Sequence, residues 1–184
     1  MKSTLLVLLL AAFGLLQNPA CAQNKVPSAT PGDSCGPANL KFDVEHDNSQ
    51  VPPSDPEPGK ALVYVIEVFD DTPGQLGIPT VRIGLDGSWI GANSGSSYLF
   101  LSVDPGEHHL CASPQSNLKR LSGQRLTTDF TAEAGKTYFF QAQVHMQGSG
   151  GAGETWSIDL QPVTAEDAKY LVANSPLSVP HPKK

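Results

Sequence analysis

The pattern of apolar and polar residues predicts a chain built mostly from β-strands. Residues 61–69 are almost continuously apolar and β-branched, which predicts a central strand buried on both faces. Residues 81–85 instead alternate between apolar and polar side chains. This alternation is typical of a strand with one buried face.

Turn signals separate the next strands. Asp86-Gly87 divides residues 81–85 from a short return strand at 88–92 and is typical of a type I′ hairpin turn, whose two central residues need positive φ. Asp104-Pro105-Gly106 divides strand 97–103 from strand 107–113 in the same way. A further strand is expected at 126–132, before the turn at Glu133-Ala134-Gly135.

The clearest two-sided pattern follows in residues 136–146 and 156–161, which predict a long antiparallel hairpin with one solvent-exposed face. The polar residues expected on that face are Gln141, Gln143, His145, Thr155, Ser157 and Asp159. Their amides, hydroxyls and carboxylate suit hydrogen bonding to a polar ligand such as a glycan. The alternative is an ordinary solvated sheet face. Trp89 is a further candidate, as an exposed aromatic platform or as a residue packed on the sheet.

Near the C-terminus, Thr164 is expected to cap a short helix that ends near Asn174. Prolines then predict an extended tail over residues 175–184. About seven strands with frequent turns and one short helix indicate an all-β protein, an antiparallel β-sandwich of about seven strands with a short C-terminal helix.

The first 22 residues have the pattern of a signal peptide. Lys2 provides the positive charge, residues 5–16 are an uncharged apolar run, and Ala20-Cys21-Ala22 provides small residues for cleavage. This predicts an exported protein, periplasmic or extracellular. Cys21 as the lipid-modified first residue of a lipoprotein is the alternative, and only then is a membrane a partner. It is disfavoured because Asn18 occupies the position where a leucine-like residue is needed.

Residues 23–59 read as a Pro-rich extended arm, so regular structure is expected to begin at Lys60 and the β-sandwich domain to span residues 60–174. If Cys21 leaves with the signal, Cys35 and Cys111 remain. Two cysteines in an exported chain most simply form one disulfide. Two buried free thiols, or a metal site, are the alternatives.

Charge and motifs exclude several functions. Removal of residues 1–22 takes away one basic residue and leaves 11 basic and 18 acidic residues, a net charge of −7. This disfavours nucleic acid and anionic membranes as partners. Gly135-Lys136-Thr137 lacks the earlier glycine of a phosphate-binding loop. His108 and His109 are neighbours on a strand and so point to opposite faces. No cofactor, metal site or catalytic residue is therefore predicted.

Four segments of the chain share features with a known family: 59–65, 81–87 with Ile90-Gly91, 104–111 and 134–140. Through them residues 59–146 resemble a family of exported bacterial domains of unknown function. The order of strands and turns in these segments (strand, Asp-Gly, strand, Pro-Gly, strand) is also similar to that of PEGA-type β-modules. The resemblance implies an exported, often envelope-associated β-sandwich without established catalysis, and it implies no functional residue.

The sequence therefore predicts an exported, non-enzymatic β-sandwich module that binds a ligand or associates with the cell envelope. The sequence does not identify the partner, and a glycan and an envelope protein are the candidates. The alternatives are a hydrolase acting on envelope polymers and a structural accessory subunit.

Overall fold

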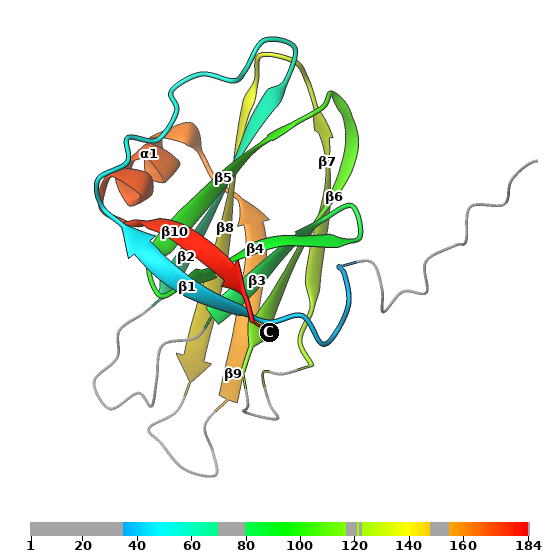
Figure 1. Ribbon diagram of the computed structural model, residues 1–184, viewed down its shortest axis with the longest axis vertical. Coiled ribbons are helices and arrows are strands. Elements are labelled where there is room, and N and C mark those ends of the chain that lie inside the picture. Colours follow the sequence, from blue (N-terminus) through cyan, green and yellow to red (C-terminus); the bar gives the residue numbers. More distant parts are fainter. Residues whose placement is uncertain (1–34, 70–79, 117–120, 122, 148–154, 184) are drawn as a thin grey trace, which may run out of the picture.

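The structure is a computed structural model that describes residues 35–69, 80–116, 121, 123–147 and 155–183 (Figure 1). The predicted signal peptide, including Cys21, lies outside these residues. Within them, no helix is long and apolar enough to cross a membrane.

Ten strands and one short helix make up the described part of the chain. The elements are β1 (Phe42–Asp47), β2 (Ala61–Phe69), β3 (Thr80–Leu85), β4 (Ser88–Ser94), β5 (Ser97–Val103), β6 (Gly106–Gln115), β7 (Leu126–Ala132), β8 (Thr137–Gln147), β9 (Thr155–Pro162), α1 (Ala165–Ala173) and β10 (Leu177–Pro182). The predicted all-β character is confirmed, whereas a sandwich of about seven strands is not, because there are ten strands in two sheets.

The six-stranded sheet has the order β1-β10-β5-β2-β8-β9, and the four-stranded sheet has the order β4-β3-β6-β7. Most strand pairs are antiparallel, as predicted, but β2 is parallel to β8 and β10 is parallel to β5, so the antiparallel prediction is incomplete. Between β2 and β8 the chain forms β5 and all four strands of the other sheet, and β8 then runs in the same direction as β2. The periodicity of the sequence does not show which strands pair or in which direction, so this parallel pairing could not be predicted from it.

Strand β2 is central because both of its faces are apolar. Val63 and Val65 face a core to which both sheets contribute, with Val81 and Ile83 of β3 on the other side. Leu62 and Tyr64 lie on the opposite face of β2, in a second apolar cluster. That cluster is closed by α1, which contributes Ala168, Leu171 and Val172. Figure 1 shows α1 at the side of the six-stranded sheet.

The segments predicted as an arm and a tail are part of the six-stranded sheet. β1 and β10 pair antiparallel, from Phe42 opposite Pro182 to Asp47 opposite Leu177. The predicted start of regular structure at Lys60 and the domain limits of 60–174 are therefore too narrow. Prolines are tolerated in β10 because its pairing with β5 includes Leu177 alone, so the later residues need no hydrogen bond on that side.

The predicted disulfide between Cys35 and Cys111 is confirmed. It fixes the described part of the arm to β6, in a small buried cluster with Trp89. Trp89 Nε1 donates a hydrogen bond to the Pro37 carbonyl at 2.8 Å. The Arg82 guanidinium lies 4.4 Å from the Trp89 ring centroid and donates to the carbonyls of Ala38 and Leu40. Residues 35–40 are therefore held against the outer face of the four-stranded sheet.

Replacing both cysteines by serine is expected to lower the free energy of unfolding by about 2–4 kcal/mol, because the bond closes a long loop. Denaturant titration of the double variant against the oxidised protein measures this. Reduced wild-type protein is the control and should unfold at a midpoint close to that of the double variant. An unchanged midpoint in both would contradict the prediction.

One carboxyl group is buried in the core. Glu67 lies on the same face of β2 as Val65, is 0% exposed, and has no hydrogen-bond partner for either oxygen among the described residues. Burial raises the pKa of Glu67 well above its ordinary value of 4.5. Nearby, the Asn93 amide donates to the Val65 carbonyl at 3.0 Å, while its own oxygen has no partner among these residues. Glu67 is therefore stable in the folded protein as the neutral acid.

A raised pKa in the folded state means that the stability contributed by Glu67 is greatest below pH 4.5 and is lost as the pH rises towards the folded pKa. We expect Glu67→Gln to raise the free energy of unfolding at pH 7 by about 1–3 kcal/mol. At pH 4 the variant and the wild type should be nearly equal. Denaturant titrations at both pH values test this. If the substitution changes the free energy of unfolding equally at pH 4 and pH 7, burial does not keep Glu67 protonated.

Candidate functional site

A concave site lies on the outer face of the six-stranded sheet, and we call it the aromatic groove. Its volume is about 910 Å³, within the range of small-molecule and cofactor sites. It lies between α1 and residues 47–54, which we call the proline segment. The residues that line it are Asp47, Asn48, Gln50, Pro52, Pro53, Ser54, Tyr64, Tyr98, Thr137, Phe139, Ala165, Lys169, Val172, Ala173, Asn174, Ser175 and Pro176.

Three aromatic residues from adjacent strands form the floor of the groove. Tyr64 of β2 lies opposite Phe139 of β8, and their rings stack with centroids 5.3 Å apart. The ring of Tyr98, from β5, lies 6.1 Å from that of Tyr64. Because side chains alternate along β2, Tyr64 projects away from the core between the sheets. The floor is therefore the outer apolar face of the central strand and its neighbours.

The helix forms one wall. It begins as predicted, since the Thr164 side chain accepts a hydrogen bond from the backbone N–H of Asp167, and it ends at Asn174 as its C-cap. Ala165, Lys169 and Val172 line the groove from this helix. Apolar positions of α1 pack on the sheet while Lys169 stays exposed.

The proline segment forms the opposite wall, and Figure 1 shows this part of the chain passing beside α1 after β1. The Tyr64 hydroxyl donates a hydrogen bond to the carbonyl of Pro53. At the start of the segment, the Asp47 carboxylate accepts bonds from the Ser49 N–H at 2.7 Å and the Ser49 hydroxyl at 2.6 Å. These two Ser49 bonds lower the pKa of Asp47, so its carboxylate stays ionised.

The two tyrosine hydroxyls of the floor remain protonated donors. Burial, with a smaller effect from Tyr98, raises the pKa of Tyr64 to about 12. Burial and then the negative charge of Asp47 raise the pKa of Tyr98. The Tyr98 hydroxyl makes no hydrogen bond to any described residue, so one donor on the floor has no acceptor.

Comparisons of the chain with protein-family models, with curated proteins and with solved structures found no match. The resemblance of residues 59–146 to exported domains of unknown function therefore stays a prediction. The candidate site rests on geometry alone.

The structure brings most of the predicted polar face together. Asp159 lies opposite Gln143 and Ser157 opposite His145, while Thr155 begins β9 opposite Gln147. His145 Nε2 lies 2.8 Å from an Asp159 carboxylate oxygen, and the Gln141 amide donates to the Gln143 amide oxygen at 3.1 Å. This face is on the same side of β8 as Phe139 and thus on the same sheet face as the groove. Several of its polar groups are already paired with each other, and a ligand role for it stays a prediction.

Trp89 is not an exposed platform. Its side chain is 9% exposed and packs against the outer face of the four-stranded sheet. The groove itself was not predicted, because its floor, helix and proline segment come from distant parts of the sequence. The available signals were Tyr64 within an apolar strand and the paired prolines at 52 and 53.

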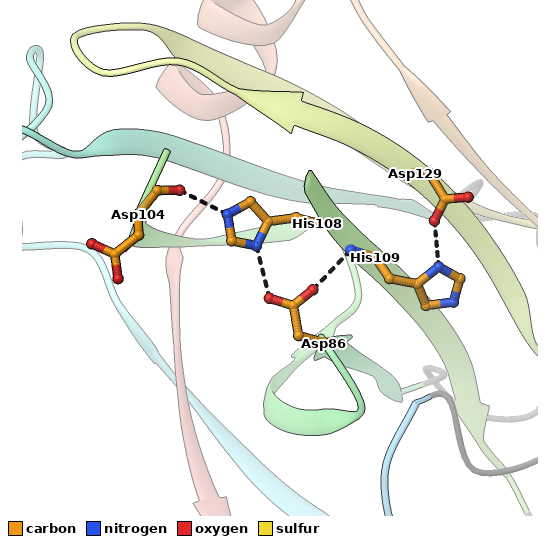
Figure 2. Close-up of polar contacts among 5 residues, drawn as sticks. All are labelled: Asp86, Asp104, His108, His109 and Asp129. Carbon is orange, nitrogen blue, oxygen red and sulfur yellow. Dashed lines mark hydrogen bonds and ion pairs between the residues drawn. The ribbon is translucent and has the colours of Figure 1, made fainter. Parts of the chain in front are cut away.

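A second cluster of polar groups lies where turns of both sheets meet (Figure 2). His108 Nδ1 lies 2.7 Å from an Asp86 carboxylate oxygen, and Nε2 lies 2.7 Å from the Asp104 carbonyl oxygen. Asp86 also accepts the backbone N–H of His109, and the Lys60 ammonium donates to the Asp104 carboxylate. Asp86 and Gly87 have φ of 50° and 80°, which confirms the predicted turn with positive φ.

These contacts favour the doubly protonated His108 ring. A carbonyl oxygen only accepts, so Nε2 carries a proton, and a carboxylate accepts from Nδ1 in the same way. Burial of the ring by itself lowers the pKa of His108, but the Asp104 carbonyl and the Asp86 carboxylate raise it by more. The net pKa therefore lies above the ordinary value of 6.5.

His109 faces a different partner, since its Nδ1 lies 2.5 Å from an Asp129 carboxylate oxygen (Figure 2). The two neighbouring rings thus have separate partners, as expected on a strand. In the described ranges, no group of three or more His, Cys, Asp or Glu side chains could hold a metal ion.

Because the folded pKa of His108 is raised, its contribution to stability is complete below pH 6.5 and is lost as the pH rises through the folded pKa. We expect His108→Gln to cost about 1 kcal/mol at pH 6 and to flatten the fall in stability between pH 6 and pH 8. Unfolding titrations at several pH values measure the slope. His181→Gln is the control, since its ring is 54% exposed and lies 3.9 Å from the nearest carboxylate oxygen. Equal slopes in all three proteins would contradict the prediction.

Proposed function

We propose that this protein is an exported binding module without catalytic activity, and that its ligand lies in the aromatic groove. The observation that carries this proposal is the groove itself. It is concave, its floor is aromatic, and amide and hydroxyl groups of Asn48, Ser54 and Asn174 lie along its walls. Apolar walls with a few polar groups are typical of ligand sites.

Export is supported by two features. The first 22 residues have the pattern of a signal peptide, and the Cys35–Cys111 bond is of a kind that persists in oxidising compartments. A β-sandwich is the architecture we assign, since residues from both sheets share one core. An association with the cell envelope follows from the family resemblance.

A binding role is favoured over hydrolysis by the ionisable groups of the groove. Hydrolysis of a glycosidic bond generally uses two carboxyl groups at a fixed separation, and the described residues that line the groove include only one, that of Asp47. Its lowered pKa makes it a poor proton donor. Lys169 is exposed, and both tyrosines are held protonated.

A structural accessory subunit would be marked by a large exposed apolar patch. Among the described residues, the exposed large hydrophobic side chains are Val51, Ile90 and Tyr170. Val51 and Tyr170 neighbour Pro52 and Lys169 in the sequence, but they do not line the groove themselves. Single exposed apolar side chains are ordinary on a protein surface, so they do not favour a structural accessory role.

The NMR signals of side-chain amides can show whether a ligand binds in the groove or on the polar face. We expect a panel of neutral oligosaccharides and proline-rich peptides, titrated into the isotope-labelled mature protein, to shift the NMR signals of the Asn48 and Asn174 amides. The amides of Gln141 and Gln143 should not move. Asn48→Ala should weaken binding about three- to tenfold, as expected for one lost hydrogen bond.

The matched control is Gln143→Ala, which removes an amide from the polar face and should leave the affinity unchanged. If only the amide signals of Gln141 and Gln143 shift, the ligand binds to the polar face and not in the groove. Hydrolysis of any oligosaccharide in the panel would show that the protein is an enzyme.

A further inference from the structure

We propose that the aromatic groove binds a proline-rich segment of a partner protein in the polyproline II conformation. This inference rests on the proposed function and names the class of ligand for the same site. The chain itself places two prolines, Pro52 and Pro53, along one wall of the groove, and the Tyr64 hydroxyl binds the carbonyl of one of them.

The contact between Tyr64 and Pro53 shows how the groove satisfies such a segment. A polyproline II chain makes no internal hydrogen bonds, so its carbonyl oxygens need donors from elsewhere. The Tyr64 hydroxyl donates to the Pro53 carbonyl. An aromatic-lined groove that holds an extended proline segment is a recurring mode of peptide recognition.

A second donor of the same kind is available on the floor. The Tyr98 ring lies 6.1 Å from that of Tyr64, it lines the groove, and its hydroxyl has no partner among the described residues. The Tyr98 hydroxyl can therefore donate a hydrogen bond to a carbonyl of the ligand, as the Tyr64 hydroxyl does to the Pro53 carbonyl. Phe139, Val172 and Pro176 provide apolar walls for the ligand's proline rings.

The same rings are poorly placed for stacking on a sugar. Tyr64 and Tyr98 are only 4% and 2% exposed, and the ring of Tyr64 is packed against those of Tyr98, Phe100 and Phe139. Little of either ring is therefore free to stack on a sugar. Asp47 and Lys169 give the groove one charge of each sign, which suits an uncharged segment. These features favour a proline-rich peptide over a glycan.

The test uses the full mature protein and two capped, uncharged ten-residue peptides, decaproline and a glycine-serine sequence. We expect calorimetry to show binding of decaproline and none of the glycine-serine peptide. Tyr98→Phe removes only the unpartnered hydroxyl, so the variant should unfold at the wild-type midpoint yet bind decaproline about tenfold more weakly.

The matched control is Tyr170→Phe, which removes a hydroxyl from a helix residue that is 71% exposed and does not line the groove. Its affinity for decaproline should equal that of the wild type. Equal binding of both peptides, or unchanged binding by Tyr98→Phe, would overturn the inference. If a neutral oligosaccharide then binds and Asn48→Ala weakens it, the proposed function stands and the peptide class is wrong. If no probe binds in the groove, both are wrong.

Discussion

The rest of the structure depends on the need to cover both faces of strand β2. One face is covered by the four-stranded sheet, which contributes Val81 and Ile83 to the shared core. The other face has only α1, a helix of nine residues, whose length of about 13 Å is shorter than the sheet it covers. The proline segment supplies the remaining cover, and the space left between it and the helix is the aromatic groove. The constraint that forms the core thus also forms the candidate site.

Two protonated groups influence stability from opposite ends of the fold. Glu67 lies opposite Ser97 at the start of β5, and His108 is bound to Asp104 just beyond its end. These two ends are separated by about 20 Å at the rise of a strand, so the two effects should add. Burial holds the proton on Glu67, whereas neighbouring acceptors hold it on His108. Both causes raise the pKa of the group in the folded state, so both stabilise the folded protein at low pH.

Much of the fold could be predicted because it depends on local patterns. The apolar run at 61–69 gives β2, Asp86-Gly87 gives the hairpin turn, and Thr164 gives the helix start. The failures are non-local. Prolines at 180 and 182 suggest a free tail, but an almost unpaired side of β10 accommodates them. Periodicity identified the residues of the polar face, yet it cannot show which sheet face a helix and a distant segment will cover.

The position of the proline segment also bears on how the proposed ligand would bind in the groove. On one side the segment continues from β1, which pairs with β10 along its whole length. On the other side Lys60 is held by backbone bonds to Glu57 and Gly135. A wall fixed at both ends loses little conformational entropy when a ligand binds. Between those ends Tyr64 fixes the segment through Pro53, so its hydroxyl is a structural group, whereas the Tyr98 hydroxyl is the donor left for the ligand that we propose.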